Sequence, residues 1–184
     1  MDALTALHSR VSVSRLTDPA PDQQTLNNLF KAAMRAPDHG LLRPWRFLTV
    51  QGAARERLAD IFVQATLQDE PDITAAKLDK LRGKPLRAPM IIIAICSPKD
   101  HPKVPVLEQQ LATGAAVENM MIAAHAQDVG AIWRTGPMAT HETVTRALGL
   151  TGPESILGFI YLGSIDGPRR PLKEEDFNDY FQDW

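Results

Sequence analysis

Residues 105–128, PVLEQQLATGAAVENMMIAAHAQD, are the stretch that decides the fold. After Pro105 the stretch contains no proline, and a proline suits the first turn of a helix that would end before Gly130. Its middle is apolar on nearly every side and built of small residues, which predicts a buried helix that its neighbours approach closely. Because Glu118 and Gln127 make it too polar for a membrane span, we expect it to form the spine of the core or of an interface.

Helices and strands alternate on both sides of this central stretch. Amphipathic or apolar patterns predict helices near residues 4–7, 22–36, 58–65, 73–84 and 142–148. Similar patterns predict strands at residues 45–50, 90–96, 131–133 and 156–162. The strand at 90–96 is continuously apolar and rich in isoleucine, as is typical of a strand covered on both faces. On its own, this alternation would favour a parallel α/β sheet.

The composition indicates a single domain over residues 1–184. Of these residues 44% are hydrophobic and 23% are charged, which is average for a globular domain. The net charge of −2 argues against a dedicated nucleic-acid binder, and we interpret the basic cluster at residues 77–87 as a solvated helix face. The tail at residues 172–184 is rich in aromatic side chains, so we expect it to pack on another surface.

Two further features bear on where the protein works. Cys96 is the only cysteine, which excludes an internal disulfide and favours a reducing compartment. No apolar run is long enough to span a membrane, and the first residues lack the basic and apolar parts of a signal peptide. We therefore expect a cytoplasmic protein that binds no membrane.

The motifs of several enzyme classes are absent. No Gly-x-Gly-x-x-Gly follows a predicted strand, and neither His-Glu-x-x-His nor Gly-x-Ser-x-Gly occurs. The five histidines are scattered, without a cysteine or carboxylate at the spacing of metal ligands, so no metal site is expected. Nucleotide hydrolysis by a phosphate loop, metal-dependent hydrolysis and esterase chemistry are therefore poorly supported.

Three polar segments could instead bind a ligand together. The first contains Arg10 and Ser12, and a guanidinium can grip a phosphate through paired hydrogen bonds that a hydroxyl supplements. Taken alone, the same residues could equally cap a helix or form a turn. The second is RAPDHG at residues 35–40, where proline and glycine fix a loop that displays charged side chains; the alternative is a rigid connection with solvated charges.

The third segment is GAIWRTGP at residues 130–137. A short apolar strand runs directly into polar groups that could contact a ligand. In isolation, Trp133 could be only core packing and Arg134 only a surface charge.

Together and in this order, these segments resemble the FMN-dependent nitroreductase superfamily, and within it the short YdjA-like NAD(P)H nitroreductases. The resemblance covers nearly the whole chain and rests on six blocks, at residues 1–4, 35–39, 44–47, 101–105, 132–136 and 158–163. It implies an α+β fold with three layers, in which a mixed, largely antiparallel sheet packs among helices. It also implies that the long central helix lies at the interface of a homodimer with two FMN clefts, each shared between the subunits.

The resemblance also implies an activity. Such an enzyme passes hydride from NADH or NADPH through flavin N5 to a nitroaromatic, a quinone or a similar acceptor by a ping-pong mechanism. The flavin carries the chemistry, so the chain itself needs no catalytic residue, although His39 and Arg134 could assist. The alternative is a non-catalytic protein, a sensor or carrier, that binds flavin or another small ligand on the same scaffold.

The resemblance assigns residues to each part of the flavin. Its phosphate and ribityl end would be held by Arg10, Val11 and Ser12, with Arg169 or Arg170 as a weaker candidate.

The ring of the flavin would be held by the other two segments. Trp133, Arg134 and Thr135 would run along it, with the Thr135 N–H as the donor to N5, while Arg35 and His39 would come from the partner subunit. The nicotinamide would be bordered by the residues before that strand, namely Ala123, Ala124, His125, Ala126, Gln127 and Asp128.

Overall fold

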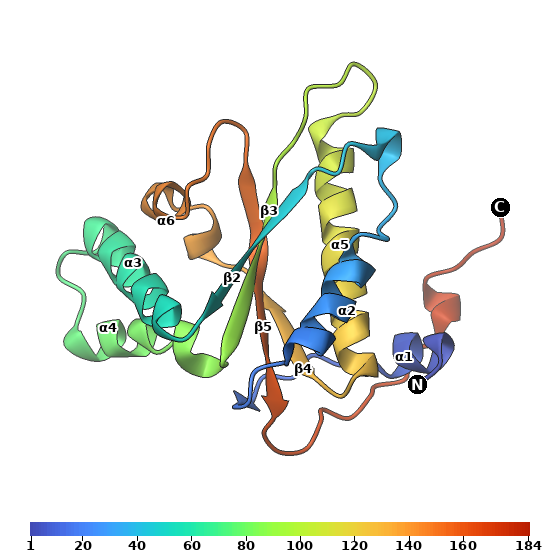
Figure 1. The fold of residues 1–184 in the computed structure, drawn as a ribbon, viewed down its shortest axis with the longest axis horizontal. Coiled ribbons are helices and arrows are strands. Elements are labelled where there is room, and N and C mark those ends of the chain that lie inside the picture. Colours follow the sequence, from blue (N-terminus) through green and yellow to red (C-terminus); the bar gives the residue numbers. More distant parts are fainter.

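A computed structural model describes residues 1–184 as a sheet between two layers of helices (Figure 1). One face of the sheet carries α2 (Gln23–Ala33) and α5 (Val106–Ala126). The other face carries α3 (Ala53–Asp69), α4 (Ala75–Arg82) and α6 (Glu142–Ala147). The short helix α1 (Ala3–Ser9) packs against α5, and none of the helices combines the length and apolar character needed to cross a membrane.

The sheet is antiparallel throughout. Its central strands are β3 (Met90–Cys96) and β5 (Ser155–Ile165), and β2 (Trp45–Gln51) forms one edge. On the side away from β3, β5 pairs with β4 (Gly130–Arg134) and, nearer its own C-terminal end, with the two-residue β1 (Leu16–Thr17). The α+β architecture expected from the resemblance is confirmed, whereas the parallel sheet favoured by alternation alone is wrong.

The reason for the antiparallel sheet lies in the connection between β2 and β3. Gln51, the last residue of β2, is paired with Met90, the first residue of β3. The helices α3 and α4 between them therefore return the chain to the end of the sheet from which it left. A parallel pair would instead require the helices to carry the chain back to the opposite end.

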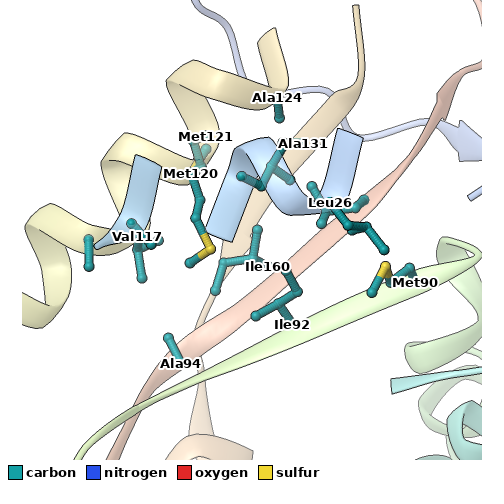
Figure 2. Close-up of a cluster of buried hydrophobic side chains, with 14 of the residues drawn as sticks. Leu26, Met90, Ile92, Ala94, Val117, Met120, Met121, Ala124, Ala131 and Ile160 are labelled. Carbon is teal, nitrogen blue, oxygen red and sulfur yellow. The ribbon is translucent and has the colours of Figure 1, made fainter. Parts of the chain in front are cut away.

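The core on the α5 side is built from small and flexible side chains (Figure 2). Val117 and Met120 of α5 are buried against Ile160 of β5 and Ile92 of β3. The predicted central helix is thus confirmed as the spine of the core. Ile92 and Ala94 face α5 while Ile91, Ile93 and Ile95 face α3 and α6, which explains why all of β3 is apolar.

The predicted helix that begins at Asp22 is confirmed at its start. The Asp22 carboxylate caps α2 by accepting from the Thr25 N–H at 2.8 Å. The regular helix ends at Ala33, earlier than predicted. Backbone hydrogen bonds from the Arg35 N–H to the Ala32 C=O and from the Ala36 N–H to the Ala33 C=O form a last turn next to Pro37. The chain also has four single turns of 3-10 helix, η1 (His39–Leu41), η2 (Pro85–Arg87), η3 (Pro137–Ala139) and η4 (Phe177–Asp179).

The aromatic tail does not find the packing that the sequence predicts within one chain. Phe177, Tyr180, Phe181 and Trp184 are all exposed. In Figure 1 the tail runs past α1 and away from the sheet, on the same side of the molecule as α5. A surface outside this chain would be needed to cover it.

Candidate functional site

At the outer edge of β4, the N-terminal segment (residues 10–15) lies next to the loop that follows β4. The strand pairs with β5 on one side, and on its other side the Val13 N–H donates to the Ala131 C=O at 2.9 Å. Successive residues of an antiparallel strand direct their backbone groups to opposite sides, so those of Trp133 also point away from β5. Just past the strand, the Thr135 N–H makes no hydrogen bond within the chain. This edge therefore offers backbone donors to a ligand.

Arg10 stands at the start of the segment that leads to this edge, and its side chain is only partly paired. It follows the last residue of α1, and its Nε lies 3.1 Å from Oε1 of Glu118 on α5. Its Nη1 is buried and has no hydrogen-bond partner. A buried guanidinium N–H without an acceptor is unfavourable, so this position suits an anionic oxygen from a ligand. Val11, the next residue, is half-buried.

Ser9 fastens α1 to α5 immediately before Arg10. Its Oγ donates to the Thr5 C=O and lies 2.8 Å from Nε2 of His125. Because that donation uses the only hydroxyl proton, Nε2 must carry the ring proton and donate to Ser9. Burial, and then the charges of Arg169 and Arg10, hold the pKa of His125 below its ordinary value. His125 is thus a neutral donor that fixes the start of the N-terminal segment.

The residues proposed to border the nicotinamide, 123–128, lie at the C-terminal end of α5. The Gln127 side chain accepts from the Asn28 side chain at 2.7 Å, and Asp128 forms an ion pair with Arg169. None of the six lines the cavity beside β4 that is described below. Their proposed role stays a prediction.

A hollow of about 280 Å³ beside the N-terminal segment brings Ser12 and Arg170 together. Arg170 makes no ion pair and no hydrogen bond, so its guanidinium is available to a ligand. Arg169 is turned instead toward Asp128, with which it is paired. Of the two arginines that the sequence left open, the geometry therefore favours Arg170 as the neighbour of Ser12.

The Trp133 side chain is half-buried and packs across β5 toward α5 rather than along the free edge. Its indole Nε1 donates to the Leu157 C=O at 3.1 Å. The ring crosses β5 directly above Gly158, where any Cβ would overlap the indole nitrogen, and its far end lies against Gly114 of α5. What Trp133 offers to the outer edge is therefore its backbone.

A cavity of about 400 Å³ opens at the end of β4, on the face of the sheet that α3 covers. The Arg134 guanidinium lies over the Tyr161 ring, 5.8 Å from its centroid, and its Nε is buried without a hydrogen-bond partner. Burial raises the pKa of Tyr161, which keeps its hydroxyl protonated at neutral pH. The residues that line this cavity are Phe62, Lys84, Arg87, Trp133, Arg134, Thr135, Gly136, Pro137, Met138, Phe159 and Tyr161.

The loop with Arg35 and His39 lies elsewhere on the same chain. It leads into β2, and because β3 and β5 stand between β2 and β4, the two strands are roughly 14 Å apart. Arg35 lines a separate hollow of about 390 Å³ with Arg43, and Nδ1 of His39 lies 2.6 Å from Oε2 of Glu108 on α5. A single chain therefore does not bring Arg35 and His39 to the edge of β4.

Sequence reasoning missed Lys84, Arg87 and Tyr161 as residues of the cavity. Lys84 and Arg87 belong to the basic cluster that was interpreted as a solvated helix face, but α4 ends at Arg82. The turn η2 that follows directs the chain toward β3 and brings both residues to the cavity. A possible signal was the change from helix to proline-containing turn at Gly83-Lys84-Pro85.

The sequence and the fold of this chain are both similar to those of known proteins. Residues 7–164 match the sequence profile of the Nitroreductase family. A candidate NAD(P)H nitroreductase of Escherichia coli K12, YdjA, is 42% identical over 164 residues, which cover 89% of this chain and 88% of that protein.

Solved structures share the fold at lower identity. A nitroreductase-like family protein from Bacillus cereus has a TM-score of 0.87 at 22% identity, covering 100% of this chain and 96% of that chain. A variant of NfnB, described as an FMN- and NADPH-dependent nitroreductase from Sphigopyxis sp. strain HMH, has a TM-score of 0.79 at 20% identity. That alignment covers 100% of this chain and 99% of NfnB.

Proposed function

Because this chain belongs to the nitroreductase family, we propose that it is an FMN-dependent oxidoreductase that uses NADH or NADPH. The observation that carries the proposal is the outer edge of β4, where arginines with unpartnered N–H groups lie near free backbone donors. Arg10 and Ser12 belong to the segment that Val13 bonds to this edge, and Arg170 shares a hollow with Ser12, whereas Arg134 ends the strand and the Thr135 N–H follows it. An elongated ligand with a phosphate at one end and a polar ring at the other would be held by these two groups of residues.

The residues of the N-terminal segment and the tail fit a phosphate. The buried Nη1 of Arg10 has no acceptor in the chain, and Ser12 shares a hollow with the unpaired Arg170. Two guanidinium groups and a hydroxyl are well suited to phosphate oxygens because charged hydrogen bonds are stronger than neutral ones. We assign the phosphate and ribityl end of FMN to Arg10, Val11, Ser12 and Arg170.

The residues at the end of β4 fit the edge of a flavin ring. The Thr135 N–H, without an acceptor of its own, is the proposed donor to N5. Arg134, whose Nε also lacks a partner, places a positive charge next to the ring, where it would favour a negatively charged state. The Trp133 indole would hold this segment in place from behind by packing on β5.

We further propose that the functional unit is a homodimer whose two sites are shared. The distance between β2 and β4 supports this idea, because Arg35 and His39 could reach the β4 edge only from another chain. Exposed apolar side chains on the same side of the molecule would be covered in such a dimer. They lie on α1, on the first turns of α5 and on the tail, and include Leu4, Leu7, Leu107, Leu111, Phe177 and Phe181.

Bound FMN would supply the redox chemistry, taking hydride from NAD(P)H and delivering it to a nitroaromatic, a quinone or a similar acceptor in a ping-pong sequence. The chain's own residues bind and orient. His39, held through Nδ1 by Glu108, is proposed to position the ring or the acceptor with its other nitrogen. The buried, unpaired thiol of Cys96 is compatible with work in the reducing cytoplasm.

The test is the colour of the purified protein. We expect a yellow protein that bleaches anaerobically with NADH or NADPH and regains its colour when a nitroaromatic or a quinone is added. A yellow protein that no pyridine nucleotide bleaches would instead be a flavin binder without turnover. A colourless protein that does not bind added FMN would contradict the proposal.

A further inference from the structure

Three cationic side chains line the cavity at the end of β4 without an anionic or hydrogen-bonding partner. Lys84, Arg87 and Arg134 make neither an ion pair nor a side-chain hydrogen bond within the chain, and no aspartate or glutamate lines the cavity. Elsewhere the chain pairs many of its arginines, as in the ion pairs of Arg46 with Glu154 and Arg82 with Asp60. The cavity is therefore a concentration of positive charge that the protein leaves open to a ligand.

The remaining walls of the cavity are aromatic. Phe62 and Phe159 meet edge to face, with ring centroids 5.5 Å apart, and Tyr161 lies beside them beneath Arg134. Phe62, Phe159 and Tyr161 are all buried, so their positions are fixed by the core. The Tyr161 hydroxyl makes no hydrogen bond within the chain and is free to donate one. An aromatic ring with a polar substituent matches these walls.

The volume of the cavity limits what can enter. About 400 Å³ lies near the lower end of the range for small-molecule sites, so the cavity holds a compound of one or two rings and not a whole dinucleotide. The cations are arranged at two depths. Arg134 has a buried Nε at the strand, whereas Lys84 and Arg87 are exposed at the rim.

From these observations we infer that the cavity binds an aromatic acceptor carrying one anionic group, such as a carboxylate, which Lys84 and Arg87 recognise. This inference rests on the proposed function, since it names the substrate class of that same site. The ring would lie among Phe62, Phe159 and Tyr161, and the carboxylate would meet the two rim cations. Neutral acceptors of the same shape would be weaker substrates because they leave those cations unpaired.

The first test compares two acceptors of nearly the same shape, one anionic and one neutral. We expect kcat/KM of the FMN-loaded protein to be at least about tenfold higher for 4-nitrobenzoate than for 4-nitrobenzamide. In the double variant Lys84→Gln, Arg87→Gln, measured at equal flavin occupancy, this ratio should fall to near one. Arg57→Gln is the matched control, because Arg57 is an exposed arginine of α3 that lines no part of the cavity, and it should keep the ratio. A wild-type ratio near one, or a ratio that the double variant retains, overturns the inference.

The second test needs no turnover and separates this inference from the proposed function. Benzoate and benzamide, which cannot be reduced, are titrated into the FMN-loaded protein by calorimetry. Benzoate should bind at least about tenfold more tightly, and the double variant should lose that preference. If neither nitro compound is reduced but benzoate is still preferred, the proposed function fails and the anion-binding cavity stands. If the double variant changes KM for NADPH but not the preference for benzoate, the cations serve the nucleotide and the inference is wrong.

Discussion

The Val13 N–H donates to the Ala131 C=O at 2.9 Å, and this bond fixes the N-terminal segment along the free edge of β4. Segments more than a hundred residues apart thus share one strand edge. Arg10 and Ser12 come just before Val13 in this segment, and Arg134 and Thr135 come just after Ala131, at the end of β4.

Replacement of Arg10 by alanine should weaken FMN binding without unfolding the protein. Arg10 contributes a charged hydrogen bond to the proposed phosphate, a loss of about 1.5–3 kcal/mol, or roughly 10- to 100-fold in Kd. Flavin content after dialysis and a fluorescence titration with FMN measure this. Arg57→Ala removes an exposed arginine of α3 and serves as the control. Full flavin occupancy in the Arg10 variant would remove that residue from the site.

The two arginines of the tail should behave differently. Arg170→Ala should lower FMN affinity by about tenfold, because Arg170 is unpaired and shares a hollow with Ser12. Arg169→Ala should leave the affinity nearly unchanged, since Arg169 is engaged by Asp128. FMN titrations of both variants side by side test this, and an equal loss in both would show that the tail rearranges when flavin binds.

Gly158→Ala should destabilise the protein through Trp133. Any Cβ at this position overlaps the indole nitrogen, so the ring must leave its hydrogen bond to Leu157, at a cost of about 1–3 kcal/mol. Gly114→Ala is the control on the other side of the same indole, where a Cβ would lie at an ordinary 3.7 Å from the ring. The control should be neutral or stabilising by up to about 1 kcal/mol, since alanine favours the helix. Urea unfolding measures both, and equal stability of the two variants would refute the packing described for Trp133.

Acid should weaken the contact between β2 and the loop before β5. The Arg46 guanidinium binds Glu154 through two hydrogen bonds of 2.7 and 2.8 Å and lowers the pKa of that carboxyl to about 2 from its ordinary 4.5. A carboxyl whose folded pKa is lowered stabilises the protein above its unfolded pKa and loses that effect as pH falls. The contribution has an upper limit on the order of 3 kcal/mol and disappears between about pH 4.5 and pH 2.

Glu154→Gln should therefore lower the free energy of unfolding at pH 7, and the gap to the wild type should narrow as pH falls below 4.5. Denaturant unfolding at pH 7, 4 and 3 measures this. Glu174→Gln, an exposed glutamate of the tail with no ion pair, should follow the wild type at every pH. A gap that is independent of pH would mean that the ion pair is not formed in solution.

Much of the fold could be predicted because it depends on local pattern. The proline-free stretch 105–128 and the isoleucines of 90–96 are signals that lie within a single element, and both elements were found. The antiparallel sheet could not be obtained this way, since it depends on pairing between Gln51 and Met90, which are far apart in sequence. The two-residue strand β1 has no pattern of its own and exists only through its bonds to β5.

The candidate site, too, could be predicted only in part from the sequence. Arg10, Ser12 and Thr135 lie in short motifs that can be seen in the sequence, and the fold brings these motifs to one edge. Lys84 and Arg87 could not be singled out, because they join Tyr161 around the cavity only when η2 packs against α3. The packing of Trp133 on β5 also depends on the absence of a side chain at Gly158, which no local pattern reveals.

The central claim, that each flavin site is built from two chains, is tested most directly by mixing two defective variants. Arg10→Ala and Arg35→Ala proteins are each prepared without flavin, carry different affinity tags, and are allowed to exchange subunits. A heterodimer of the two then contains one site with both changes and one site with neither. We predict that heterodimers isolated through both tags bind one FMN per dimer with wild-type affinity. Isolated heterodimers that bind FMN no better than the parent variants would contradict the claim.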